Sequence, residues 1–215
     1  MRLRKKKWSD EVFTQHKDIL VDEKQNLKGQ WKQVLSTSKL RLEIGAGKGD
    51  YWLGLAEMYP EDGVIALEKD YTASSIALRK LREYGKKRFI YGDAKNLDEL
   101  FEVGELDVIH LNFSDPWPKT RHEKRRLTYD TKVKQYNRLL SDHGELWMKT
   151  DNQALFEYSL VNVSRFGFEL VEVSLDFRKE VDEDDIIDPF TEYERKFMRN
   201  NQRIYRAIWR KQNVK

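Results

Sequence analysis

The chain has 215 residues, and its 40 Lys and Arg against 37 Asp and Glu give a net charge of only +3 at pH 7. It contains no cysteine, which excludes disulfides and thiolate metal sites. No apolar run has the length of a membrane span or the form of a secretory signal. We therefore expect one domain over residues 1–215, in the cytoplasm and with no membrane partner.

Charge is distributed unevenly along this chain. Residues 1–8 carry five basic side chains, residues 176–194 carry nine acids and two bases, and residues 195–215 carry eight bases and no acid. A single such run is often only a solvated face. Several basic runs on one chain favour a polyanionic partner, and nucleic acid is the first candidate.

The hydrophobic pattern predicts an irregular basic arm over residues 1–20, a helix over 26–35, and alternating strands and helices from residue 40. The expected strands are 40–44, 63–68, 88–91, 106–113, 145–149, 168–175 and 203–209. The expected helices are 51–58, 73–84, 129–140 and 154–166. This order predicts an α/β fold with a mostly parallel seven-stranded sheet and helices on both faces. No helical pattern is visible in residues 176–202, which we interpret as a long substrate-side loop.

A glycine-rich turn follows the first expected strand, with Gly45, Gly47 and Gly49 at alternate positions. Asp50 stands where the dinucleotide fingerprint needs its third glycine, and Gly49 stands where a phosphate-binding P-loop needs Ser or Thr. Both phosphate-binding motifs therefore fail. The pattern, with Glu43 two residues before it, resembles the first motif of S-adenosylmethionine-dependent methyltransferases. That cofactor has no phosphate, and its ammonium group favours a nearby carboxylate.

Acidic residues follow several of the expected strands. Glu68 ends the second strand, where a carboxylate can accept both ribose hydroxyls of a nucleoside. Asp93 follows the third strand, but it is equally suited to cap a helix beginning near Asn96. Asp115 and Asp151 follow the fourth and fifth strands. Because ligands of open α/β sheets bind outside the carboxyl ends of the strands, this shared location predicts a site.

The most specific motif follows the fourth strand. It begins Ser114-Asp-Pro-Trp-Pro-Lys119, which is stiff because prolines flank Trp117, and it continues as the cationic run Arg121-His-Glu-Lys-Arg-Arg126. Together with Thr150-Asp-Asn152 and Thr191-Glu-Tyr-Glu194, it resembles the bacterial tRNA (guanine-N7-)-methyltransferases. The resemblance extends from the glycine turn to the last expected strand.

This resemblance implies a Rossmann-like class I methyltransferase fold with an antiparallel C-terminal strand, S-adenosylmethionine as the cofactor, tRNA as the partner and no metal, in a monomer or homodimer. The implied reaction is methyl transfer to N7 of guanine 46 in the tRNA variable loop. Site residues are implied in three groups. Cofactor binding falls on Glu43, Gly45, Gly47, Gly49, Glu68, Asp93 and Asp115, the last also being the catalytic residue. Substrate binding falls on Lys119, Asp151, Thr191, Glu192, Tyr193 and Glu194. RNA contacts fall on Arg121, His122, Glu123, Lys124, Arg125 and Arg126.

The chemistry of this transfer needs no general base, because guanine N7 carries a lone pair and no proton. Catalysis then depends on alignment and on negative charge placed where the purine cation develops. A carboxylate could accept from guanine N1–H and the 2-amino group together, and Asp115, Asp151 and Glu194 are all candidates. Trp117 either stacks on an extruded base or packs as a wall residue.

Three other activities stay open from the sequence. Methyltransferases that act on adenine N6 or cytosine N4 carry an Asp-Pro-Pro-aromatic motif close to this one. A non-enzymatic RNA-binding protein on a Rossmann-like scaffold would explain the basic runs, but it would not need acids at successive strand ends. A nicotinamide dehydrogenase fits least well because of Asp50.

Overall fold

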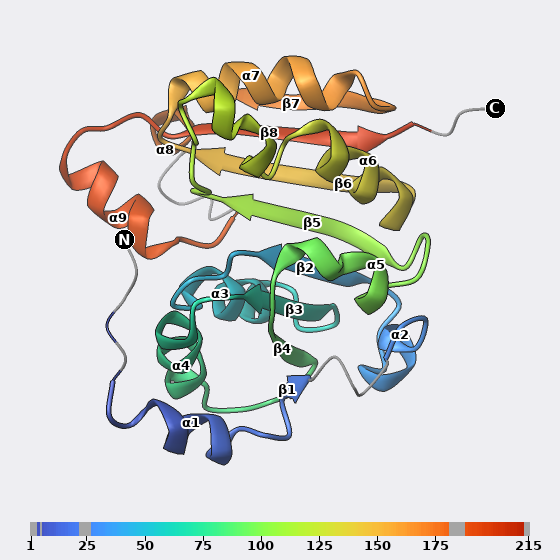
Figure 1. Cartoon of the computed structure of the whole chain (residues 1–215), viewed down its shortest axis with the longest axis vertical. Coiled ribbons are helices and arrows are strands. Elements are labelled where there is room, and N and C mark those ends of the chain that lie inside the picture. The colour runs from blue at the N-terminus through green and yellow to red at the C-terminus, as the bar shows by residue number, and fades with distance from the viewer. Residues whose placement is uncertain (1–3, 5, 22–26, 181–187, 213–215) are drawn as a thin grey trace. The chain divides into compact units, whose positions relative to one another are not determined.

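The computed structural model describes residues 4, 6–21, 27–180 and 188–212, and they form two compact units (Figure 1). Unit 1 comprises Met1–Glu102 with Asp188–Glu192, and unit 2 comprises Val103–Ile187 with Tyr193–Lys215. The single domain expected from the sequence stays a prediction. No described helix is both long and apolar enough to cross a membrane.

The described part of unit 1 has parallel strands in the order β1-β4-β3-β2. The strands are β1 (Leu20–Val21), β2 (Leu40–Ile44), β3 (Gly63–Glu68) and β4 (Lys87–Tyr91). The helices are α1 (Ser9–Gln15), α2 (Trp31–Val34), α3 (Asp50–Met58), α4 (Tyr71–Lys80) and α5 (Leu97–Leu100), the last preceded by the 3-10 helix η2 (Ala94–Asn96). All five residues of β2 are buried, as expected of a parallel strand covered on both faces.

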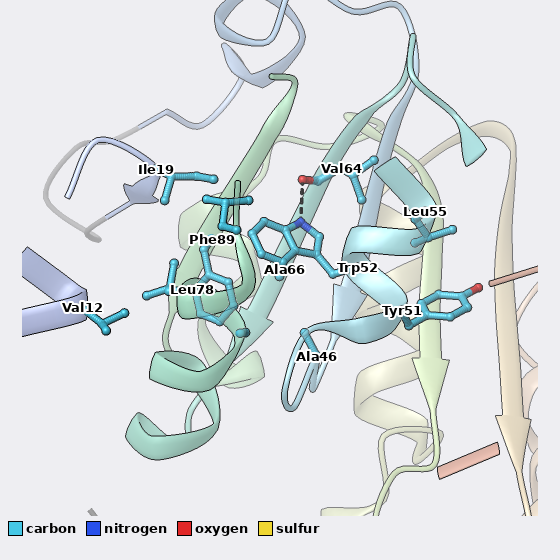
Figure 2. Packing of buried hydrophobic residues seen from close by; sticks show 12 residues of the cluster. Val12, Ile19, Ala46, Tyr51, Trp52, Leu55, Val64, Ala66, Leu78 and Phe89 are labelled. Carbon is cyan, nitrogen blue, oxygen red and sulfur yellow. Dashed lines mark hydrogen bonds between the residues drawn. The ribbon is translucent and has the colours of Figure 1, made fainter. Parts of the chain in front are cut away.

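Trp52 of α3 lies in the buried core of unit 1 (Figure 2). Its indole Nε1–H donates to the Val64 carbonyl of β3 at 3.1 Å, and its ring meets Phe89 of β4 edge-on with centroids 5.4 Å apart. A buried indole N–H is costly unless it is bonded, so this hydrogen bond fixes where α3 lies on the sheet. Since α3 begins directly after the glycine turn, the same contact positions that turn.

The described part of unit 2 has the strand order β5-β6-β8-β7. The strands are β5 (Leu106–Asn112), β6 (Leu140–Thr150), β7 (Phe168–Ser174) and β8 (Tyr205–Lys211). The helices are α6 (Asp130–Leu139), α7 (Gln153–Ser164), α8 (Phe177–Glu180) and α9 (Glu192–Arg199), with the 3-10 helix η3 (Thr120–Arg125) before α6. β5 and β6 are parallel, and β8 runs antiparallel to both β6 and β7. The expected mostly parallel sheet with an antiparallel C-terminal strand is therefore confirmed.

The N-terminal region differs from the prediction in three ways. The strand count of seven was one too low for the described residues, because the short β1 pairs with β4. The arm over residues 1–20 is not irregular throughout, since α1 packs beside α4, where Ser9 Oγ lies 2.9 Å from Ser75 Oγ in a buried hydrogen bond (Figure 1). Residues 1–3 and 5 of that arm lie outside the described residues. The helix expected over 26–35 is described only as the single turn α2.

The late segment also differs from the prediction. Residues 176–202 were expected to hold no helix, but α8 and α9 lie within them. The helical period was missed because α9 is polar except on one narrow side, and α8 is a single turn. Most of the acidic stretch 180–188 lies outside the described residues.

Candidate active site

The three glycines between β2 and α3 all have left-handed backbone, with φ of 78° at Gly45, 55° at Gly47 and 79° at Gly49. Other residues adopt this conformation only with strain. The glycines differ in their surroundings. A Cβ added at Gly49 would lie 2.7 Å from the Ala77 Cβ of α4, whereas a Cβ at Gly45 would meet no atom of the described residues within 4 Å. Gly49 therefore permits close packing, and Gly45 leaves an open backbone face for a ligand.

Glu68 holds the glycine turn at the end of β3. Its Oε2 accepts from the Gly47 N–H at 3.0 Å, and its Oε1 accepts from the N–H groups of Lys69 and Asp70 at 2.8 and 2.7 Å. These three bonds fix the carboxylate in one orientation. Each carboxylate oxygen can accept more than one hydrogen bond, so the orientation still suits a ligand that presents two hydroxyls.

The other two acids of the cofactor group lie in different environments. Glu43 is 2% exposed on β2, two residues before the glycine turn. Asp93 is half-buried after β4, and its Oδ1 accepts from the Lys95 N–H at 3.0 Å at the start of η2. The alternative that Asp93 acts as a helix cap is thus confirmed. Its role toward a cofactor stays a prediction.

In unit 2, the Asp-Pro-Trp-Pro turn after β5 is strained at its centre. Trp117 has φ of 42°, a left-handed conformation that costs a bulky residue about 1–3 kcal/mol. Arg126 spans the turn, with Nε donating to the Pro116 carbonyl and Nη2 donating to the Trp117 carbonyl, each at 3.1 Å. The guanidinium of Arg125 lies 4.8 Å from the centroid of the Trp117 ring, and His122 meets that ring edge-on at 5.8 Å.

The cationic run is not uniform in exposure. Lys119, Arg121, Lys124 and Arg125 are exposed, whereas Arg126 is half-buried. His122 and Glu123 are half-buried too. The run forms η3 rather than the first turn of an α-helix, because α6 begins only at Asp130. The exposed cations are therefore placed to meet phosphates, while Arg126 is occupied within the protein.

Asp151 follows β6 and is exposed, as is Asp115 after β5. Asp151 is not the N-cap of the next helix, α7. That cap is Asn152, whose Oδ1 accepts from the Leu155 N–H at 2.8 Å. The Asn152 N–H itself donates to Thr150 Oγ1 at 3.1 Å. The carboxylate of Asp151 is therefore not used to cap α7.

The segment Asp188–Glu192 packs against the glycine turn and α3 within unit 1. The Lys48 ammonium of the turn lies 2.8 Å from a carboxylate oxygen of Glu192. The Tyr51 hydroxyl donates to Asp188 Oδ1 at 2.6 Å in a buried hydrogen bond. Thr191 between them is 6% exposed. The sequence placed this segment in a loop, and the resemblance assigned Thr191 and Glu192 to substrate binding. The structure brings the segment to the glycine turn that is predicted to bind the cofactor.

The remaining two residues of the Thr191–Glu194 motif lie in unit 2 and differ in exposure. Tyr193 is 48% exposed and lies beside Phe113 and Phe197, with ring centroids 6.0 and 6.3 Å away. Glu194 is 0% exposed, and its carboxylate contacts two buried cations that sequence reasoning missed, Lys149 of β6 and Arg178 of α8. A lysine directly after the apolar run 146–148 was the available signal for the first, whereas the second lay in the segment expected to be a loop.

Among the described residues, no group of three or more His, Asp and Glu side chains is placed to hold a metal ion. What the described geometry offers is a glycine turn held by a carboxylate in unit 1, and a stiff turn with exposed carboxylates and cations in unit 2. The first suits a nucleoside-containing cofactor without phosphate, and the second suits an anionic substrate.

Comparisons with known proteins agree with this description. A family model described as "Putative methyltransferase" matches residues 37–207. A protein of Pediococcus pentosaceus named tRNA (guanine-N(7)-)-methyltransferase is 41% identical, covering 96% of this chain and 98% of that protein. An Exiguobacterium protein of the same name is 42% identical, covering 99% of this chain and 100% of its own length.

Solved structures show the same fold at low sequence identity. The 16S rRNA methyltransferase KamB has a TM-score of 0.62 at 12% identity, covering 86% of this chain and 94% of that one. A 16S rRNA (adenine(1408)-N(1))-methyltransferase variant from Catenulisporales acidiphilia, solved with its cosubstrate, has a TM-score of 0.59 at 9% identity, covering 91% and 93% of the two chains. The expected methyltransferase fold is confirmed.

Proposed function

The chain belongs to the tRNA (guanine-N7-)-methyltransferase family, and on that premise we propose that it transfers the methyl group of S-adenosylmethionine to N7 of guanine 46 in the variable loop of tRNA. Near full-length similarity to relatives of this name is the observation that carries the proposal. The glycine turn held by Glu68 and the stiff turn after β5 support it from the structure. Because its substrate is tRNA, we expect the enzyme to act in the cytoplasm, as a monomer or homodimer.

The unit 1 residues suit the two ends of the cofactor. We assign Glu43 to the ammonium end, the open backbone face at Gly45 to the amino-acid chain, and Glu68 to the ribose hydroxyls. The oxygens of Glu68 already hold three backbone amides, so the carboxylate is oriented before the ribose arrives. Asp93 lies after β4, where an acid would meet the adenine edge. The bound cofactor supplies an electrophilic methyl group on a sulfonium, which guanine N7 attacks with its lone pair.

The carboxylates of unit 2 suit the guanine. Asp115 and Asp151 are exposed, and either can accept from guanine N1–H and the 2-amino group, a pair of donors that adenine does not offer. Burial of Glu194 between Lys149 and Arg178 argues against the same role for it. Negative charge from Asp115 at the base also favours the purine cation that develops during transfer, and no residue has to remove a proton.

The exposed cations suit the RNA backbone. Lys119, Arg121, Lys124 and Arg125 lie on or directly before η3, and phosphate contacts of this kind supply affinity and salt sensitivity more than base choice. The Trp117 ring lies beside Arg125 and His122, and it is suited to stack on an extruded base. tRNA selection would then come from its shape, with the guanine edge checked by a carboxylate.

The experiment that tests this function is methyl transfer from labelled S-adenosylmethionine to unmodified tRNA, with the product nucleoside and its position found by mass spectrometry. A tRNA carrying adenine at position 46 is the matched control substrate, and Asp115→Ala is the matched enzyme. We expect 7-methylguanosine at position 46 only, and strong loss of product in both controls. Label on an exocyclic amine would instead support the adenine or cytosine activity, and absence of cofactor binding would support a non-enzymatic RNA-binding protein.

A further inference from the structure

Arg126 differs from the other basic residues of the run to which it belongs. Two of its three guanidinium nitrogens, Nε and Nη2, donate to the carbonyls of Pro116 and Trp117, and its guanidinium carbon lies 4.4 Å from the centroid of the Tyr158 ring on α7. It is half-buried, whereas Arg121 and Arg125 are exposed. Both the flat face and the edge of this guanidinium are therefore engaged inside unit 2.

The turn that Arg126 spans has little means of holding itself. Pro116 and Pro118 have no backbone N–H, so neither can close the turn by donating a hydrogen bond. Trp117 between them has φ of 42°, which carries a strain that the surrounding structure must offset. The planar fork of a guanidinium can hold two neighbouring carbonyls at once, which a single ammonium cannot do with the same geometry.

The support beneath Arg126 is itself anchored. Two residues further on, Thr128 Oγ1 lies 2.8 Å from Ser159 Oγ, and the Thr128 carbonyl accepts from Asn162 Nδ2 at 2.8 Å, both contacts being buried. Burial, followed by the charge of Asp130, raises the pKa of Tyr158. The guanidinium thus rests on a fixed part of α7, as a precise functional site requires.

We propose that Arg126 is a positioning residue for methyl transfer: it holds the Pro116–Trp117 turn in its strained conformation, so that Asp115 and Trp117 meet the guanine in one geometry. It is not a phosphate contact, in contrast to its neighbours Arg121 and Lys124. This inference rests on the proposed function, and it separates two roles within one basic run.

The decisive variant is Arg126→Lys, which keeps the positive charge and loses the fork. We expect kcat to fall by at least about 10-fold, because misplacing a reacting group by about 1 Å strongly slows the chemical step. We expect the Kd for tRNA, and its dependence on salt, to stay within twofold of wild type. Arg121→Ala is the matched comparison, and it should weaken tRNA binding and flatten the salt dependence. Arg82 is an exposed arginine of unit 1, so Arg82→Lys controls for the effect of an arginine-to-lysine exchange as such.

A second readout does not depend on activity. Acrylamide quenching of each protein, compared with its Trp117→Phe counterpart, isolates Trp117 from the other tryptophans, and Arg126→Lys should make Trp117 more accessible. If wild-type protein transferred no methyl to tRNA, the proposed function would fail while this readout still tested the contact. Tyr158→Leu removes the aromatic ring beneath Arg126 and keeps Arg126 itself, with Tyr158→Phe as its control. This pair tests the same contact if Arg126→Lys does not fold. Wild-type kcat and unchanged Trp117 quenching in Arg126→Lys would overturn the proposal, as would a loss of tRNA affinity equal to that of Arg121→Ala.

Discussion

Lys149 and Glu194 form a buried ion pair in unit 2, with Lys149 Nζ 3.1 and 3.0 Å from the two carboxylate oxygens. Arg178 shares the carboxylate, its Nη2 lying 2.8 Å from Oε1. The three side chains are 2%, 0% and 7% exposed. Because they come from β6, α9 and α8, one carboxylate fastens two helices of the late segment to the sheet.

Replacing Glu194 by Gln should therefore act first on stability. The change removes the negative charge that two buried cations share, and breaking a buried pair costs about 3 kcal/mol in the free energy of unfolding. Urea unfolding would measure it. Glu192→Gln is the matched control on the same helix. Its ion pair with Lys48 is partly exposed, so the cost there should be below about 1 kcal/mol. Wild-type stability with lost tRNA affinity in Glu194→Gln would show that Glu194 contacts the substrate instead.

The glycine turn offers a matched pair of substitutions. Gly49→Ala would place a Cβ 2.7 Å from the Ala77 Cβ and 3.2 Å from the Ala77 Cα, so α4 must move and we expect a loss of about 2–3 kcal/mol in unfolding free energy. Gly45→Ala meets no such contact in the described structure and should cost about 1 kcal/mol, from its positive φ alone.

The two glycine substitutions should also differ in their effect on cofactor affinity. Gly45→Ala fills the open backbone face and should weaken S-adenosylmethionine binding at least tenfold by calorimetry. Gly85 has φ of 47°, and among the described residues only the Lys87 ammonium lies within 4 Å of an added Cβ, so Gly85→Ala reproduces the strain outside the site. It should leave cofactor affinity unchanged. Equal affinity in all three proteins would remove Gly45 from the cofactor site.

Asp115→Asn should lower kcat by about 100-fold, because it removes negative charge from where the purine cation develops. Since guanine N7 loses no proton, wild-type kcat should be flat from about pH 6 to 8. Single-turnover rates across this range would test both points. A solvent deuterium isotope effect on the wild-type rate, absent in Asp115→Asn, would instead assign the aspartate to general base catalysis.

Removing exposed cations beside the stiff turn should weaken tRNA binding most at low salt. Lys124→Ala should reduce the slope of log affinity against log salt by about 0.7 to 0.9, the amount expected of one phosphate contact. Lys39→Ala, an exposed lysine at the opposite end of β2 from the glycine turn, removes the same charge and should not change the slope. Equal slopes for the two variants would mean that net charge, and not a local contact, governs binding.

Local sequence patterns determined the main elements of this protein. Most of the expected strands and the long helices lie within a few residues of their observed bounds, because each is set by its own hydrophobic period and by the glycines and prolines at its ends. The glycine turn and the Asp-Pro-Trp-Pro turn were likewise visible, since their glycines and prolines mark them in the sequence.

Only the tertiary structure decided which polar residues stabilise the fold and which remain free to bind ligands. Asn152 and not Asp151 caps α7. The buried carboxylate of Glu194 is paired with cations about 16 and 45 residues away in the chain. Arg126 contacts carbonyls while its neighbours face solvent. Charged residues of one type look alike in a sequence. Their roles differ because burial removes water, and a buried charge must then be satisfied by partners that only the folded chain brings within reach.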